Sequence, residues 1–351
     1  MTSSRLAKFL FVMAAALLVG AQQPVNAQSS SGLFAGKTVS ILIGFSPGGS
    51  NDVWARVMSK YFGKHLPGNP TIVVQNFPGA GGLRLMNELY NASPKDGTVL
   101  GLVNRGLAFE PLLGGANTRF DANKMNWIGS PDRDVTICVA RKDAAVQTMQ
   151  DLFSKTLVVG ASGSGADTAI YPQFLSELLG MKFKIVLGYP GSKDISVAME
   201  RNEVEGICVA YETVMRQNLA RQGQINILFQ AALQPDSRMK DVPVGTDLAR
   251  SEQDRAVLKL FFARVAMGRP IVAPPGVDPE RVAALRKGFD DMMKDEAFLA
   301  EAKAIDLRID AITGQELTEV VESTYRTPKE VVTRAAEILG HLNEAEKSEK
   351  K

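Results

Sequence analysis

The sequence predicts an α/β fold in which helices flank sheets of mostly parallel strands. Eight short apolar segments have the length and composition of strands, and most of them are separated by segments with helical periodicity. Such alternation is typical of layered α/β domains. With 351 residues, of which 45% are hydrophobic and 22% charged, the chain is long enough for one large domain or two ordinary ones.

The N-terminus has the pattern of a secretory signal peptide. Basic residues precede the apolar run 9–21, and small residues at 25–27 form a cleavage pattern. The run is too short to span a bilayer well, and no cysteine for a lipid anchor follows the expected cut. We therefore expect residues 1–27 to be a signal peptide and the mature, exported protein to begin near Gln28.

The charge of the mature chain argues against a nucleic-acid partner. The whole sequence has 40 basic side chains, and two of them lie in the expected signal, which leaves 38 to balance 38 acidic ones. Proteins that bind nucleic acid usually carry a basic excess gathered on one face. The sequence shows no such excess.

The strands and helices follow one another along the chain. The expected strands are residues 39–45, 71–75, 99–103, 135–140, 156–160, 184–189, 205–210 and 225–229. Helical periodicity marks residues 52–66, 83–92, 168–179 and 195–201, followed by longer helical segments at 277–302 and 327–351. The proline-rich run 265–276 fits an extended return connection, because its prolines are poorly compatible with a helix.

A loop of small residues follows the first expected strand. The strand ends at Phe45, and Gly48 and Gly49 permit a tight turn and the close approach of a ligand. Three polar residues can cap the next helix: Ser50, Asn51 and Asp52. The N-terminus of that helix offers unpaired N–H groups to a carboxylate or phosphate. The alternative is a well-made turn with a helix cap and no ligand.

Two further loops repeat this arrangement. Residues 78–82 (PGAGG) and residues 162–165 (SGSG) consist almost wholly of small residues, and each lies between an expected strand and an expected helix. The carboxyl ends of parallel strands meet at one edge of a sheet, which is where open α/β sheets bind ligands. The three loops supply backbone donors and hydroxyls but few acid–base side chains, so they favour binding an anion over transforming it.

Enzyme and metal sites find less support. The loops lack the third glycine of the dinucleotide fingerprint and the Lys-Ser/Thr ending of a P-loop. A serine hydrolase would need His65 or His341 as its base, and both are interpreted as surface residues. With only these two histidines a histidine-rich metal centre is excluded, and we expect neither metal nor cofactor. A lysine-assisted lyase stays open, although no lysine is marked out by its neighbours.

The two cysteines have two readings. In an oxidising compartment Cys138 and Cys208 can form a disulfide. Alternatively they are small buried hydrophobes in the two expected strands that contain them. The sequence does not choose between these readings.

The glycine loops carry a resemblance to a known family. The segments KTVSILIGFSPGGSNDVWARVMSKYF and IVVQNFPGAGGLRLMNELYNASPKDGTVLGLVN resemble the periplasmic receptors of tripartite tricarboxylate transporters, also called the Bug family. The matching residues are Phe45, Gly48, Gly49, Asp52, Asn76, 78–82, Pro94, Asp96 and Gly97. Weaker similarity extends through ASGSGADT, LGYPGSKDISVAM and KDVPVGTDLA to the C-terminal helices, over almost all of the mature chain.

The resemblance implies a two-lobed, type II periplasmic-binding-protein fold. The first lobe is expected to comprise residues 33–134 and 268–345, the second residues 135–267, with a charged tail at 346–351. The implied ligand-binding residues are Phe45, Gly48, Gly49, Ser50, Asp52, Gly79, Ala80, Gly81, Gly82 and Asn104 on the first lobe, and Ser162, Ser164, Gly165, Tyr189 and Gly191 on the second.

The same resemblance implies a function. A small organic carboxylate would be captured between the lobes by a periplasmic monomer and delivered to the membrane subunits of a transporter. A secreted enzyme acting on a small carboxylate and a sensor for a signalling receptor are the alternatives. Glu212 follows the strand at 205–210, where it would repel a dicarboxylate and hold a ligand amine if it faced the cleft, or it is a solvated acid.

Overall fold

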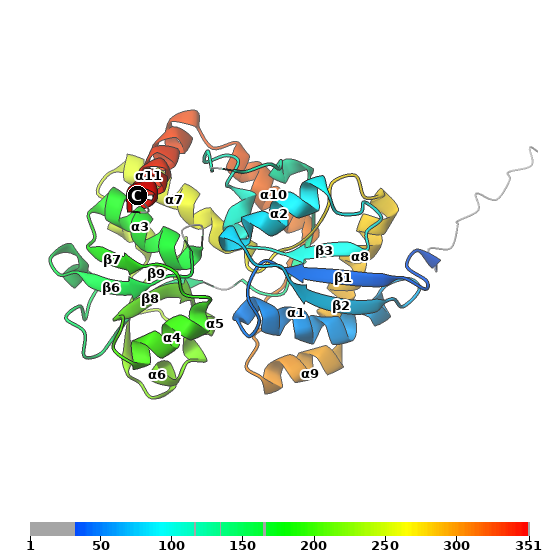
Figure 1. Cartoon of the computed structure of the whole chain (residues 1–351), viewed down its shortest axis with the longest axis horizontal. Coiled ribbons are helices and arrows are strands. Elements are labelled where there is room, and N and C mark those ends of the chain that lie inside the picture. The colour runs from blue at the N-terminus through cyan, green and yellow to red at the C-terminus, as the bar shows by residue number, and fades with distance from the viewer. Residues whose placement is uncertain (1–31, 116, 134, 164–165, 350–351) are drawn as a thin grey trace, which may run out of the picture.

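The protein has two α/β lobes, each built around one sheet (Figure 1). The computed structural model describes residues 32–115, 117–133, 135–163 and 166–349. The expected signal peptide, residues 1–27, lies outside the described residues. The α/β class and the two-lobed organisation predicted from the sequence are confirmed.

The first lobe contains a six-stranded sheet with the order β11-β4-β10-β3-β1-β2. Its strands are β1 (Thr38–Ile43), β2 (Thr71–Asn76), β3 (Val99–Leu102), β4 (Asn126–Ser130), β10 (Ile271–Ala273) and β11 (Ile312–Thr313). β1 is parallel to β2 and to β3, so the loops after these three strands emerge at the same edge. β10 is antiparallel to β3 and β4, and β11 to β4.

Helices cover both faces of this sheet. They are α1 (Ser50–Tyr61), α2 (Leu83–Asn91), α8 (Pro279–Met292), α9 (Glu296–Ala304) and α10 (Gly314–Tyr325), with short 3₁₀ turns η2 (Phe62–His65), η3 (Ala80–Gly82), η4 (Arg105–Ala108) and η5 (Ala122–Lys124). α1 forms because Trp54, Met58 and Phe62 recur on one side, where all three are buried against the sheet. This packing fixes the direction in which the first glycine loop points.

The second lobe contains a five-stranded sheet with the order β7-β6-β8-β5-β9. Its strands are β5 (Thr136–Arg141), β6 (Leu157–Gly160), β7 (Phe183–Val186), β8 (Gly206–Ala210) and β9 (Ile225–Ala231). Its helices are α3 (Asp167–Leu179), α4 (Ser192–Glu200), α5 (Tyr211–Met215), α6 (Asn218–Arg221) and α7 (Glu252–Phe262), with turns η6 (Gln150–Phe153), η7 (Gly245–Leu248) and η8 (Ala263–Met267).

Both sheets are mixed, whereas the sequence predicted mostly parallel ones. In the second lobe β6 is parallel to β7 and β8, but β5 is antiparallel to β8 and β9. The antiparallel strands β5 and β10 are the first strands that the chain forms after entering a lobe from the other one. The direction of these two strands follows from where the chain passes between the lobes, and not from a strand–helix–strand repeat.

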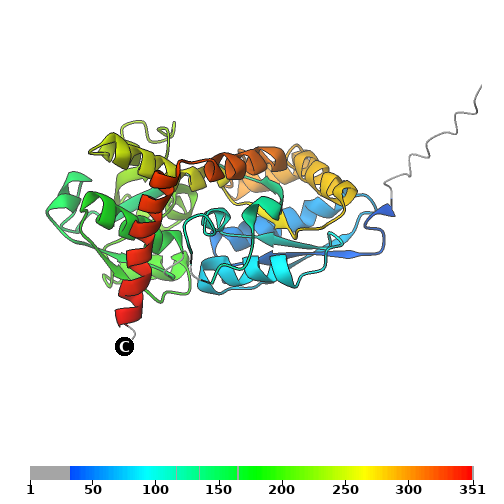
Figure 2. The same ribbon diagram turned by 90° about the horizontal axis from the view of Figure 1, so that it is seen from above.

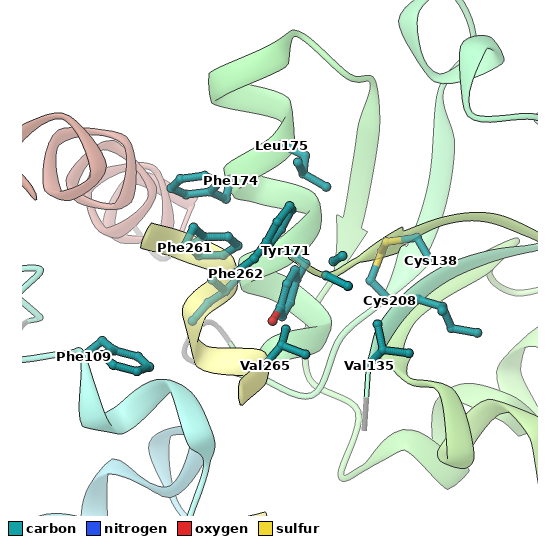
Figure 3. Packing of buried hydrophobic residues seen from close by; sticks show 14 of the residues in the cluster. Phe109, Val135, Cys138, Tyr171, Phe174, Leu175, Cys208, Phe261, Phe262 and Val265 are labelled. Carbon is teal, nitrogen blue, oxygen red and sulfur yellow. A yellow bond between two sulfur atoms is a disulfide. The ribbon is translucent and has the colours of Figure 1, made fainter. Parts of the chain in front are cut away.

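The core of the second lobe combines an aromatic cluster with a disulfide (Figure 3). Phe261 stacks on Phe174 with ring centroids 3.7 Å apart and meets Tyr171 edge-on at 5.1 Å. Cys138 of β5 and Cys208 of β8 are direct cross-strand partners and are joined by the disulfide. The sequence left this pairing open. A bond across 70 residues contributes roughly 4 kcal/mol on the chain-entropy model.

The C-terminal helix returns to the second lobe. α11 (Lys329–Glu349) packs against α3 and α7, as Figure 2 shows for the long helix at the end of the chain. Its residues Val331, Ala335 and Ile338 are buried in the aromatic cluster. The sequence assigned residues up to 345 to the first lobe. In the structure, α11 instead packs on α3 and α7 of the second lobe.

Candidate ligand-binding site

A cavity of about 350 Å³ lies between the two lobes. From the first lobe it is lined by the loop between β1 and α1, the end of β3 and the connection before β10. From the second lobe it is lined by Ser162, the first turns of α3 and α4, and the end of β8. All but the connection before β10 follow a strand or begin a helix, so backbone N–H groups and side chains converge on one space.

The first loop is held in shape by Asp52. Its Oδ2 accepts hydrogen bonds from the Gly48 N–H and from Arg56 Nε, both at 2.9 Å, and its Oδ1 accepts one from Asn76 Nδ2 at 3.0 Å. Asn76 also donates to the carbonyl of Phe45 at 3.0 Å. Burial opposes ionisation of this carboxyl, but the hydrogen bonds from Arg56, Gly48 and Asn76 together hold its pKa below the ordinary value. Asp52 therefore braces the loop from behind the cavity.

The cap of α1 differs from the prediction. Gly49 is the N-cap residue and no side chain bonds to the helix as a cap there, whereas Ser50 already belongs to the helix. Asp52 reaches back to the Gly48 N–H instead. Gly48 has φ +83°, a conformation that favours glycine, so the loop needs this residue for its path.

The second glycine loop packs against the ends of β1 and β3. A Cβ on Gly44 would lie only 3.0 Å from the Cα of Gly82, and a Cβ on Gly82 would lie 3.7 Å from the Cβ of Asn104. These contacts bring β1, the second loop and the end of β3 into direct packing. Small residues are required here because side chains would separate the three segments.

Arg105 joins the two lobes at the inner end of the cavity. The preceding residue, Asn104, accepts a hydrogen bond from the Gly106 N–H at 2.7 Å and so starts the η4 turn. Arg105 Nε donates to Asp167 Oδ2 at 2.9 Å, and its Nη2 donates to the hydroxyl of Thr136. Arg105 is only 6% exposed, so its charge acts in a poorly solvated space.

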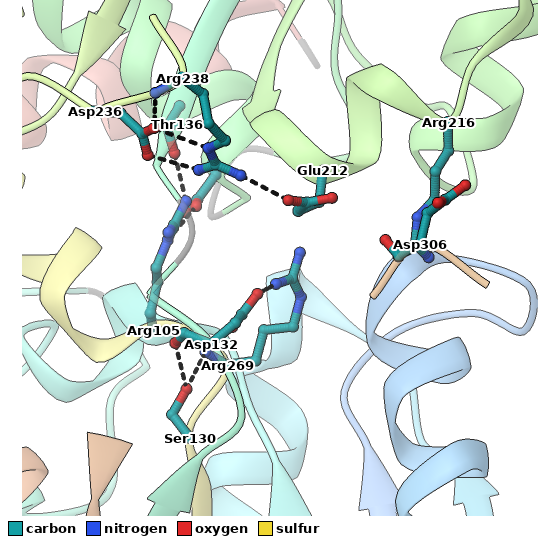
Figure 4. Close-up of polar contacts among 11 residues, drawn as sticks. Arg105, Ser130, Asp132, Thr136, Glu212, Arg216, Asp236, Arg238, Arg269 and Asp306 are labelled. Carbon is teal, nitrogen blue, oxygen red and sulfur yellow. Dashed lines mark hydrogen bonds and ion pairs between the residues drawn. The ribbon is translucent and has the colours of Figure 1, made fainter. Parts of the chain in front are cut away.

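A second buried arginine, Arg269, lies on the same wall (Figure 4). It pairs with the carboxylate of Asp132, and its backbone N–H donates to Ser130 Oγ at 2.8 Å. Burial, and then the positive charge of Arg105, lower the pKa of Arg269 to about 9. Two arginines that disfavour each other's charge would be stabilised by an anion placed between the lobes.

The wall from the second lobe is polar and more solvated. The backbone N–H of Ser162 donates to Thr168 Oγ1 at 3.1 Å, which ties the third loop to the first turn of α3. Lys193 and Asp194 in the first turn of α4 line the cavity and are exposed to solvent. This wall offers hydroxyls, the amino ends of two helices and screened charges.

The residues predicted from the sequence fall into three groups. Those that line the cavity are Phe45, Gly49, Ser50, Asn104, Ser162 and Gly191, and Gly48 lines an adjoining cavity. Those away from both linings are Asp52, Gly79, Ala80, Gly81, Gly82 and Tyr189. Ser164 and Gly165 lie outside the described residues. The ligand-binding roles of all these residues stay predictions.

Glu212, in α5, is paired within its own lobe. Its carboxylate accepts a hydrogen bond from Arg238 Nη1 at 2.6 Å, and Arg238 also pairs with Asp236 at 2.6 Å (Figure 4). Glu212 does not line the cavity of about 350 Å³. No contact among the described residues supports the hypothesis that Glu212 holds a ligand amine.

His65 lies on the first lobe, where its Nε2 is 2.7 Å from Asp295 Oδ2. It does not line the cavity between the lobes. The side chain of His341 lies outside the described ones. Within the described part of the chain, no group of three histidine, cysteine, aspartate or glutamate side chains is placed to hold a metal ion.

The charged residues of the site were not predicted from the sequence. Arg105 directly follows Asn104, which was singled out, and Arg269 lies within the proline-rich connection. Asp167 begins α3 just after the predicted loop 162–165, and Lys193 is the second residue of α4. No local pattern in the sequence marks either arginine as buried.

Two α/β lobes with a cavity between them are the architecture of the type II periplasmic-binding-protein fold. The family model described as "Tripartite tricarboxylate transporter family receptor" matches residues 54–336. The chain belongs to this family of receptors, as the resemblance in its glycine loops predicted. Among the described residues, no helix combines the length and the apolar character needed to cross a bilayer.

Several known proteins are similar to the chain. The UPF0065 protein in gbd 5'region of Cupriavidus necator is 23% identical over 337 residues, which cover 92% of this chain and 94% of that protein. MatC (Rpa3494) of Rhodopseudomonas palustris with bound malate has a TM-score of 0.65 at 19% identity, covering 86% of this chain and 98% of MatC. Rpa4515 of R. palustris with adipate has a TM-score of 0.64 at 16% identity, covering 85% and 97%. These structural likenesses show the fold.

Proposed function

We propose that the protein is a periplasmic receptor that captures a small organic carboxylate between its lobes and delivers it to the membrane subunits of a tripartite transporter. The observation that carries this proposal is the pair of buried arginines, Arg105 and Arg269, in the wall of the interlobe cavity. Membership of the receptor family and the malate and adipate bound to two proteins of the same fold support it.

The residues that line the cavity indicate which end of the ligand each lobe would bind. The carboxylate would be bound by Arg105, Arg269 and the backbone of the first loop at Gly49 and Ser50. Ser162 and Gly191 of the second lobe would close over the other end of the ligand. Hydrogen bonds to a charged group contribute roughly 1.5–3 kcal/mol each, so three or four of them allow micromolar affinity after the costs of association.

Closure would be a hinge motion of two lobes about their connections. For this purpose the first lobe comprises residues 33–134 and 268–328, and the second comprises residues 135–267 and α11. The closed form would be the one that the transporter recognises. The proposal needs no cofactor, no metal and no second copy of the chain.

The proposal is tested by a thermal-shift and calorimetry screen of the mature chain with acetate, succinate, malate, adipate, citrate and glutamate. A ligand at about a hundred times its dissociation constant adds about 2.7 kcal/mol to the unfolding free energy. At least one carboxylate should produce that shift. The absence of a shift with every acid would contradict the proposal.

A substitution at Gly49 tests the location. A Cβ there meets only the Ser46 carbonyl oxygen at 3.8 Å, and aspartate is a good N-cap residue, so Gly49→Asp should fold. Its carboxylate would repel a bound carboxylate and abolish the shift. Gly49→Asn is the matched control, since it has the same shape without the charge and should bind better than Gly49→Asp. If Gly49→Asp bound the acid as tightly as the unchanged protein, the proposed location of the ligand at the first loop would be wrong.

A further inference from the structure

A third buried arginine, Arg264, lies behind the wall that carries Arg105 and Arg269. It belongs to η8, which precedes the return of the chain to the first lobe, and its side chain is only 1% exposed. A Cβ on Gly106 would lie 2.9 Å from Arg264 Nη1 and 3.2 Å from Asn104 Oδ1. Because Asn104 and Arg105 line the cavity between the lobes, the guanidinium of Arg264 lies directly behind residues of the cavity wall.

Arg264 has no counter-ion among the described residues. None of its three guanidinium nitrogens has a hydrogen-bond partner there, and its Cζ lies 4.3 Å from the centroid of the Phe261 ring. Burial raises the pKa of Glu110 and the positive charge of Arg264 opposes this rise, so the two charges interact. Within the described part of the chain they nevertheless form neither a hydrogen bond nor an ion pair.

The three buried arginines therefore include one unpaired positive charge. Arg105 is paired with Asp167, and Arg269 is paired with Asp132. Arg264 adds a positive charge with which no carboxylate of the described residues is paired. Arginine is charged at neutral pH, and a buried charge without a counter-ion is unfavourable for folding. An anion in the adjoining cavity would compensate this charge.

The charge of Arg264 acts on the same buried region as the charges of the cavity wall. Burial raises the pKa of Tyr171, and Arg105, Asp167 and Arg264 all influence the charge on its hydroxyl. Tyr171 is fully buried, so this region is poorly solvated. Electrostatic interactions are screened little in such a region, and the field of Arg264 extends to the cavity.

We propose that Arg264 is an affinity-determining residue, which stabilises the bound carboxylate through its electric field without touching it. This inference rests on the proposed function and extends it. The unpaired charge has two opposite consequences: it destabilises the protein without ligand, and it stabilises the complex with an anion. An arginine that only supports the fold has the first effect reversed and lacks the second.

The test combines urea denaturation of the unliganded protein with calorimetry, using whichever of the six acids named above binds most tightly. Arg264→Met removes the charge from a side chain of similar length, so the unliganded variant should be at least as stable as the unchanged protein. Its dissociation constant for the acid should rise about tenfold, because the charge that the anion compensates is gone. Arg264→Lys keeps a positive charge and should bind within about threefold of the unchanged protein.

Arg250→Met is the matched control. Arg250 is exposed and its guanidinium lies 5.3 Å from the centroid of the Phe153 ring, so the variant removes a charge and a ring contact of the same kind from the surface. Its dissociation constant should stay within about twofold of that of the unchanged protein, because solvent screens an exposed charge.

Four outcomes would overturn the inference while leaving the receptor function in place. They are an unliganded Arg264→Met that is less stable than the unchanged protein, an unaltered affinity of Arg264→Met, equal losses of affinity in Arg264→Met and Arg250→Met, and an Arg264→Lys that binds as weakly as Arg264→Met. If the unchanged protein binds none of the six acids, the proposed function fails, and this inference fails with it.

Discussion

The two walls of the interlobe cavity hold their charges in different ways. On the first lobe, Arg105 and Arg269 are each 6% exposed and are fixed by hydrogen bonds and ion pairs. On the second lobe, Lys193 and Asp194 are solvent-exposed at the start of α4. Because buried charges are screened little, the first lobe should supply the affinity for an anion and the second lobe should select its shape.

The largest effect is expected from Arg269→Met. The substitution leaves Asp132 buried without its ion pair, which should lower the unfolding free energy by about 3–5 kcal/mol. Urea denaturation measures this change. The double variant Arg269→Met with Asp132→Leu should recover most of the stability but none of the carboxylate binding. A single variant as stable as the unchanged protein would show that the first wall is not held by this pair.

Arg105→Gln should lower carboxylate affinity by about tenfold to a hundredfold, because it removes a charged donor from the cavity. Asp167→Asn removes the competing carboxylate on the opposite wall, so it should leave affinity unchanged or raise it. Calorimetry with the acid found in the screen gives both values. Losses of equal size in the two variants would mean that the ion pair between the walls, and not Arg105 alone, forms the site.

Asp52→Asn should have the smallest effect, a loss of about 1–3 kcal/mol near neutral pH from weakened hydrogen bonds behind the first loop. The folded-state pKa of Asp52 lies below its ordinary value of 3.8. Its contribution is therefore fully present above 3.8 and is lost as the pH falls through the lower folded value. Denaturation at neutral pH and in acid should show the two proteins converging. If the difference in unfolding free energy between the two proteins did not change with pH, the proposed role of the ionised Asp52 in holding the first loop would be wrong.

The sequence predicted those parts of the fold whose signal is local. All eight expected strands exist, since each is a run of apolar residues between turn signals. Three strands were missed: β4, which has no predicted counterpart at residues 126–130, β10, which has three residues between prolines, and β11, which has two residues. The two shortest of these strands exist only because neighbouring strands bind them, as β3 and β4 bind β10 on either side. A segment of two or three residues contains no pattern that predicts its pairing with strands from distant parts of the chain.

The residues of the candidate site also fall into two groups, those with a local signal in the sequence and those without one. Gly49 and Ser50 were found because glycine and serine at a strand–helix junction have a local meaning, and they line the cavity. Arg105 and Arg269 were missed because, along the sequence, nothing distinguishes an arginine that is buried from one on the surface. Their burial comes from the meeting of β3 with the chain that returns before β10, and that is a property of the assembled sheet.

The return of α11 to the second lobe gives the chain a third passage between lobes. α10 packs on the first lobe beside β4, and α11 packs on the second beside α3 and α7 (Figure 2). In the proposed closure, an exposed residue of α11 such as Thr333 would move with the second lobe, and Lys37, just before β1, would move with the first. A pair of spectroscopic labels on these two positions would read out opening and closing as a change in distance, without any label near the ligand.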